Sequence, residues 1–223
     1  MILGDLLGNI DWYDIGIATL DTLLMLGGSL LFTILFGLPL GILLFLTGPR
    51  QMLQRKTIYA VLSLIVNALR SLPFIILLIV MIPLTKLIAG TSLGVAGAIP
   101  PLVVGATPFF ARLVETALRE VDRGIIEATQ SMGASTWQII TRALLPESRP
   151  GIIAAVTVIA ITLVSYTAMA GVVGGGGLGD LAIRYGYQRF QTDVMVVTVV
   201  LLLVLVQILQ SIGDRLVVHY SRK

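Results

Sequence analysis

The sequence predicts an all-α integral membrane protein with five transmembrane helices and a short cytoplasmic helical element between the third and fourth. It is expected to form a single domain over residues 1–223. The chain is 57% hydrophobic and only 12% charged, with a mean hydropathy of +0.98, whereas soluble proteins are about 25% charged. Its long uncharged stretches can each supply the ~20 residues that a helix needs to cross a bilayer. They lack the alternation of a membrane strand.

Five apolar segments define the expected helices, at residues 20–46, 57–84, 93–118, 151–173 and 194–217. The first contains Gly37-Leu-Pro39-Leu-Gly41, a small-xxx-small pair that lets helices approach closely. The third opens with many glycines and prolines, which predicts an irregular, bent start inside the bundle because proline removes a backbone donor. These breakers are Gly90, Gly94, Gly97, Pro100, Pro101, Gly105 and Pro108.

The distribution of lysine and arginine predicts the orientation. Eleven of them fall on one side, which is therefore expected to be cytoplasmic: Arg50, Arg55, Lys56, Arg112, Arg119, Arg123, Arg142, Arg149, Arg215, Arg222 and Lys223. The other side holds Lys86, Arg184 and Arg189. The N-terminus is expected outside, with Asp5, Asp11, Asp14 and Asp21, and the C-terminus inside. The net charge of +3 is explained by this bias, so no nucleic-acid partner is expected.

The segment at about 124–146 is too polar to span a membrane, and its pattern predicts two short helices. The third transmembrane helix should run into water, with Arg112, Glu115 and Arg119 paired on one face. Gly133 should end the first short helix, and Ser135-x-x-Gln138 is a capping box that starts the second. The expected apolar faces are formed by Ile125, Ala128 and Met132 and by Trp137, Ile140 and Leu144.

The polar face of this segment, which includes Glu127 and Gln130, favours docking to a protein partner. The alternative is an interfacial helix that rests on lipid headgroups.

Helix two carries a polar stripe at Ser63, Asn67, Arg70, Ser71 and Phe74. Arg70 is expected near mid-membrane, where a charge is costly and usually faces protein or water. Two interpretations stay open for it. It lines a pathway near a substrate carboxylate, or it bonds the carbonyls released at Pro73.

Helix four carries a second stripe at helical spacing, formed by Thr162, Ser165, Tyr166 and Met169. A flexible thioether among small neighbours could close a narrow passage. Ordinary packing is the alternative for this stripe.

Enzyme chemistry is not expected in this chain. Gly174–Gly179 formally matches G-x-G-x-x-G, but no strand precedes it and no Lys-Ser/Thr pair follows. We therefore expect it to end helix four and form a pliable outer loop. The chain has no cysteine and its only histidine, His219, lies in the basic C-terminal tail.

The cytoplasmic segment resembles a signature of ATP-binding-cassette importer permeases, E-A-A-x3-G-x9-I-x-L-P. The matching residues are Glu127, Ala128, Gly133, Leu145 and Pro146, while Thr129 and Ala143 replace an alanine and the isoleucine. Over nearly its full length the chain resembles the permease subunit of methionine importers, most clearly at residues 70–78, 90–94, 103–112 and 174–179.

The resemblance implies a multi-pass permease of a bacterial inner membrane, surrounded by lipid, that imports L-methionine and also D-methionine. It implies a homodimer, two ATPase subunits and an extracytoplasmic methionine-binding protein. ATP and Mg would sit on the ATPase, with no cofactor on this chain. The coupling helix would span Glu127–Gly133, with Glu127, Ala128, Gly133 and Ala134 as coupling residues. Met169 would belong to the closed gate, beside the pathway candidates Tyr166, Ser165, Thr162, Arg70 and Asn67.

One alternative stays open, a self-contained secondary transporter of a small amino acid. Such proteins commonly show inverted repeats and intramembrane acidic residues, and no Asp or Glu lies inside an expected span.

Overall fold

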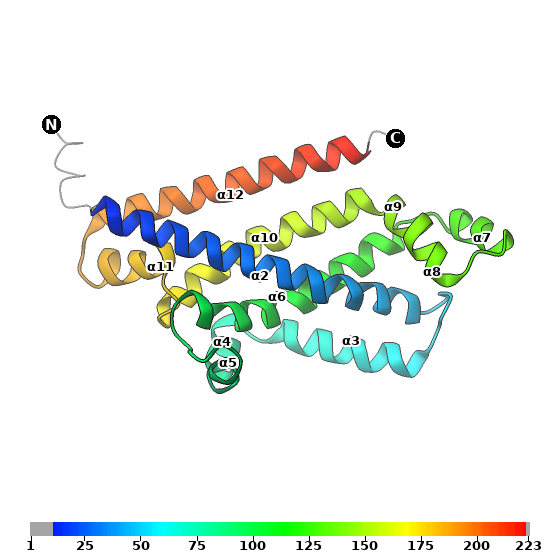
Figure 1. Ribbon diagram of the computed structural model, residues 1–223, viewed down its shortest axis with the longest axis horizontal. Coiled ribbons are helices and arrows are strands. Elements are labelled where there is room, and N and C mark those ends of the chain that lie inside the picture. Colours follow the sequence, from blue (N-terminus) through cyan, green and yellow to red (C-terminus); the bar gives the residue numbers. More distant parts are fainter. Residues whose placement is uncertain (1–10, 222–223) are drawn as a thin grey trace. The chain divides into compact units, whose positions relative to one another are not determined.

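The computed structural model describes residues 11–221 as helices joined by turns and loops, and these residues form no strand (Figure 1). Asp5, Arg222 and Lys223, which contributed to the orientation argument, lie outside the described residues. The chain divides into two compact units. Unit 1 comprises residues 1–32, 72–105 and 160–209, and unit 2 comprises 33–71, 106–159 and 210–223. Each unit is described by itself.

Within residues 11–221, four helices are long and apolar enough to cross a membrane: α2 (Trp12–Thr47), α6 (Gly94–Arg119), α10 (Arg149–Val172) and α12 (Thr192–Ser221). A fifth candidate is the broken pair α3 (Lys56–Ser71) and α4 (Phe74–Val80). The prediction of an all-helical membrane protein is therefore confirmed for residues 11–221, which hold four or five candidate membrane spans where five were predicted. The shorter elements are α5 (Ile82–Ala89), α7 (Arg123–Ser131), α8 (Thr136–Ile139), the π-helical turn η1 (Ile140–Leu144), α9 (Leu145–Glu147), α11 (Gly177–Leu181) and the π-helical turn η2 (Ala182–Tyr187).

The expected continuous helix at 57–84 is wrong, because proline breaks it. α3 ends at Ser71, and α4 begins after Pro73, whose ψ of 130° is extended. The Ser71 hydroxyl donates a hydrogen bond of 2.8 Å to the Asn67 carbonyl. The expected irregular start of the third helix is confirmed at Gly90 and Gly94, whose φ angles are +74° and +67°. It is wrong for the prolines, because α6 is helical from Gly94 onward with its prolines inside it.

The start of α2 lies eight residues before the expected position. The Asp11 carboxylate accepts the backbone N–H of Tyr13 at 2.9 Å, and a side-chain acceptor of this kind stabilises a helix N-terminus. The apolar pattern alone does not show this cap, so the first turns of α2 were missed.

Unit 1 is built on the contact between α2 and α11. Its core cluster contains Ile15, Ala18, Leu178, Leu181 and Val194. The buried Thr22 hydroxyl accepts the backbone N–H of Leu178 at 2.9 Å. Leu178 is 1% exposed, so much of the glycine segment packs against α2. The expected pliable loop is wrong for this part of the chain.

Unit 2 is built on a close approach of α2 to α6 at two glycines. A Cβ on Gly37 would lie 2.7 Å from the Phe110 ring, and one on Gly41 would lie 2.6 Å from the Ala111 carbonyl oxygen. Such distances leave no room for a side chain, so the small-xxx-small pair serves helix packing, as predicted. Leu44 and Val66 complete the buried cluster with Ala111.

Candidate functional site

The segment between α6 and α10 is an ordered set of capped short helices. Asp122 caps α7 by accepting the backbone N–H of Gly124 at 2.7 Å. Gly133 follows α7 with φ of +78°, a left-handed conformation that glycine adopts readily. Both hydrogen bonds of the predicted capping box are present, between Ser135 and Gln138. These two predicted stop and start signals are confirmed.

The predicted apolar faces of this segment are wrong in part. On α7 the buried residue is Ile126, whereas Met132 is 77% exposed. On the following helix Ile140 and Leu144 are buried as expected, but Trp137 is 71% exposed. Trp137 lies in α8, before the π-helical turn η1, and the buried part of this helix begins only at Ile139 and Ile140.

Two of the predicted coupling residues, Glu127 and Ala128, lie on α7, and Gly133 and Ala134 follow its C-terminal end. Glu127, Ala128 and Gly133 are exposed, and Ala134 is half-buried. Their accessibility suits contact with a partner.

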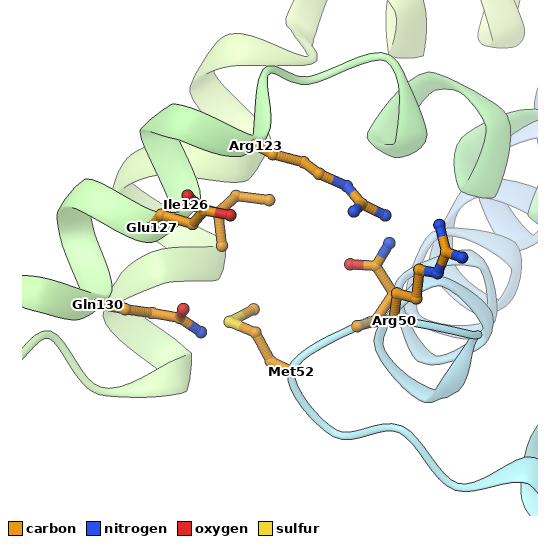
Figure 2. Close-up of a pocket in the computed structure, with 7 residues that line it drawn as sticks. Arg50, Met52, Arg123, Ile126, Glu127 and Gln130 are labelled. Atoms are coloured by element: carbon orange, nitrogen blue, oxygen red, sulfur yellow. The ribbon is translucent and has the colours of Figure 1, made fainter.

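Glu127 also lines a pocket of about 220 Å³ between α7 and the loop that follows α2 (Figure 2). The pocket is lined by Arg50, Gln51, Met52, Arg123, Ile126, Glu127 and Gln130. Figure 2 shows Arg123 extending from α7 toward the loop that carries Arg50, and Met52 pointing toward Gln130. Sequence reasoning missed Arg50 and Arg123 as site residues, because it used them only as markers of membrane orientation.

A buried charge network joins α6 to α3. Glu115 is 2% exposed, and its carboxylate forms salt bridges with the guanidinium groups of Arg112 at 2.5 Å and Arg119 at 2.6 Å. Tyr59 also donates to this carboxylate at 3.2 Å. The predicted pairing of the three charged residues is confirmed, but the carboxylate lies inside the protein and not in water.

Asn67 belongs to this network. Its side-chain oxygen accepts Arg112 at 3.0 Å, and Ser63 accepts the same guanidinium at 2.8 Å. Arg70 is separate, with its guanidinium 5.3 Å from the centre of the Phe109 ring, a cation–π arrangement. The structure therefore does not bring Asn67 and Arg70 together in one site.

The four predicted residues of α10 also divide into different environments. The Tyr166 ring stacks on Phe74 of α4, with centroids 4.2 Å apart and planes 3° apart. Ser165 and Met169 instead line an open apolar groove of about 450 Å³, whereas Thr162 does not. The groove is lined by Val164, Ser165, Ala168, Met169, Val172, Ile183, Val199, Leu202, Leu203 and Val206. Met169 is 44% exposed there, which is the accessibility that a gate or an interface residue needs.

Comparison with known proteins identifies a family whose model matches this chain. Residues 34–223 match the model of the binding-protein-dependent transport system inner membrane component family. The chain is 53% identical over 202 residues to the probable D-methionine transport system permease protein MetI of Vibrio cholerae, covering 90% of this chain and 89% of that protein. It is 50% identical over 206 residues to the methionine import system permease protein MetP of Bacillus subtilis, covering 92% and 93%.

A solved structure agrees with these relatives. A chain of the MetNI methionine ABC transporter in an inward-facing conformation is 47% identical, with a TM-score of 0.93. The match covers 95% of this chain and 98% of that one. The similarity therefore extends over nearly the whole of both chains.

Proposed function

This chain belongs to the family of binding-protein-dependent transport system inner membrane components, and we propose that it is the permease subunit of an ATP-driven methionine importer. The observation that carries the proposal is the 47% identity and TM-score of 0.93 to a chain of the MetNI methionine ABC transporter. The names of the relatives, which include methionine and D-methionine permeases, support L- and D-methionine as substrates.

The working assembly in this proposal contains two copies of the chain, two ATPase subunits and an extracytoplasmic methionine-binding protein. ATP and Mg bind to the ATPase subunits and supply the energy of transport. Each copy spans the inner membrane five times, with the broken pair α3 and α4 as one span. The excess of lysine and arginine around α7 supports a cytoplasmic location for α7 and the C-terminus.

The role of this chain is to convert motion of the ATPase into alternating access. The segment at 124–146 is the coupling element, with Glu127, Ala128, Gly133 and Ala134 at the contact. Its caps and the buried Ile126 support transmission as a rigid body, since a slack loop would absorb the displacement. Met169 and Ser165, which line the groove beside α10, are the gate and pathway candidates.

A secondary transporter is not favoured, because the family is defined by transport systems that depend on a binding protein. The groove of Met169 offers no titratable side chain for coupling to an ion gradient, since its lining residues are all apolar apart from Ser165.

Copurification tests this proposal. Tagged wild-type chain is purified in mild detergent beside two variants, Glu127→Arg and Gly133→Trp, and the accompanying proteins are identified by mass spectrometry. We expect an ATPase subunit with the wild type and its loss from both variants. If a folded wild-type chain carries no ATPase, the importer proposal fails.

A further inference from the structure

The pocket beside α7 presents three charged side chains without a charged partner. Among residues 11–221, the guanidinium groups of Arg50 and Arg123 and the carboxylate of Glu127 take part in none of the salt bridges. The backbone N–H of Arg50 donates a hydrogen bond to the side-chain oxygen of Gln54 at 3.2 Å. All three residues are exposed and line the same volume of about 220 Å³.

Arg50 lies in a loop whose backbone is strained at this residue and fixed by hydrogen bonds. Its φ of +62° lies in the left-handed region, which non-glycine residues adopt at a cost and asparagine adopts more easily. The loop is fixed by backbone hydrogen bonds from Gln51 to Gly48, from Leu53 to Leu46 and from Arg55 to Thr47. The backbone alone does not explain an arginine at position 50, so its side chain is the feature that needs a role.

We propose that this pocket is a second contact for the ATPase subunit, which places an acidic side chain between Arg50 and Arg123 and a basic group against Glu127. The inference rests on the proposed function and extends it from α7 to the loop after α2. Continuity supports it, because Arg123 and Glu127 lie on α7 itself. The two cations and one anion of the pocket define the complementary charges that such a partner has to present.

An anionic lipid headgroup fits the pocket less well. Glu127 shares the volume with the arginines and would repel a phosphate, and the remaining polar groups are the amides of Gln51 and Gln130 (Figure 2). A mixed set of donors and acceptors suits a protein surface, where the partner can satisfy each group. The fixed backbone also limits the conformational entropy lost on binding.

The second contact has a mechanical consequence. The loop leads directly into α2 at Thr47 and into α3 at Lys56. Motion of the ATPase would therefore act directly on α7 and, through the loop, on α2 and α3. One coupling helix alone would act on the bundle at a single place.

Charge reversal tests the contact. The ATPase subunit that copurifies with the wild-type chain is titrated against wild type, Arg50→Glu, Arg123→Glu and Arg55→Glu in nanodiscs. Arg55 is exposed in the same loop but does not line the pocket, so it controls for net charge. We expect affinity to fall about tenfold or more for the two pocket variants. The control should stay within about twofold, as for other exposed charges.

The strained backbone provides an independent variant. Arg50→Asn removes the charge and suits the left-handed conformation, so its melting temperature should equal or exceed that of the wild type while ATPase affinity falls. Wild-type affinity in Arg50→Asn and in both reversals would overturn the proposal. Loss of phosphatidylglycerol association with ATPase affinity intact would also overturn it in favour of a lipid. Failure of the wild type to bind any ATPase would instead refute the proposed function.

Discussion

Replacing Gly41 by alanine should separate α2 from α6 and destabilise unit 2. A Cβ at this position would lie 2.6 Å from both the Ala111 carbonyl oxygen and the Val114 Cβ, which falls 0.8 Å short of the 3.4 Å at which ordinary contact begins. The nearest obstacles are a backbone atom and a β-branched side chain, and neither can swing aside. Overpacking of this kind costs about 1–3 kcal/mol.

A matched substitution isolates this cost. Gly27 lies in the same helix, but a Cβ there would meet no atom within 4 Å. Both substitutions to alanine gain about 1 kcal/mol of helix propensity, so the difference between the two variants reports the clash. For a chain of this size 1 kcal/mol shifts the melting temperature by roughly 2–4 °C. A clash of about 2 kcal/mol therefore predicts that Gly41→Ala melts about 4–8 °C below Gly27→Ala.

The assay is thermal unfolding of both purified variants in the same detergent, followed by the loss of monodisperse protein on gel filtration. Expression level and ligand must be held equal, because both change apparent stability. Equal melting temperatures for the two variants would refute the close approach of α2 and α6 that the structure shows.

Three further predictions concern buried hydrogen bonds and caps. Glu115→Gln should lower the free energy of unfolding by about 2 kcal/mol, because Arg112 and Arg119 lose the anion that they share while part of their charge stays solvated. Exposed Glu120→Gln is the control and should change the melting temperature little. Equal changes in melting temperature for the two variants would contradict the network. Thr22→Val should cost roughly 1–3 kcal/mol in the same unfolding assay, because the buried N–H of Leu178 loses its acceptor; Thr19→Val is the control, since the Thr19 hydroxyl bonds only the carbonyl one turn earlier in its own helix. Ser135→Ala should cost about 1 kcal/mol and expose the start of α8 to proteolysis, whereas Ser135→Asp, which can still cap, should resist cleavage like the wild type.

Local signals were read correctly from the sequence. The Ser135–Gln138 capping box, the glycine stop at Gly133 and the closely packed Gly41 each depend on a few neighbouring residues, so their chemistry is visible without the fold. The pairing of Glu115 with Arg112 and Arg119 follows from helical spacing alone.

Long-range and irregular features were missed for physical reasons. Asn67 was a pathway candidate on the same stripe as Ser63. Both side chains accept hydrogen bonds from Arg112 of a different helix, and no spacing rule relates α3 to α6. Trp137 is exposed although Ile140, one turn later, is buried, because helical spacing marks apolar positions without showing which of them meets a neighbouring element. The effect of Pro73 was underestimated, since the apolar run continues through it while the helix does not.

The pocket beside α7 could not be predicted from the sequence. Arg50 and Arg123 are far apart in the sequence, where each is visible only as one of the basic residues that indicate membrane orientation. Only the fold places them in one volume with Glu127.

The most direct test of the account is methionine uptake into proteoliposomes that contain the chain, its copurified ATPase subunit and the binding protein. We expect uptake that requires Mg-ATP on the α7 side, persists when a protonophore removes the proton gradient, and is lost in Glu127→Arg although the chain remains folded. Uptake that follows a proton gradient without ATP and is unchanged in Glu127→Arg would contradict it.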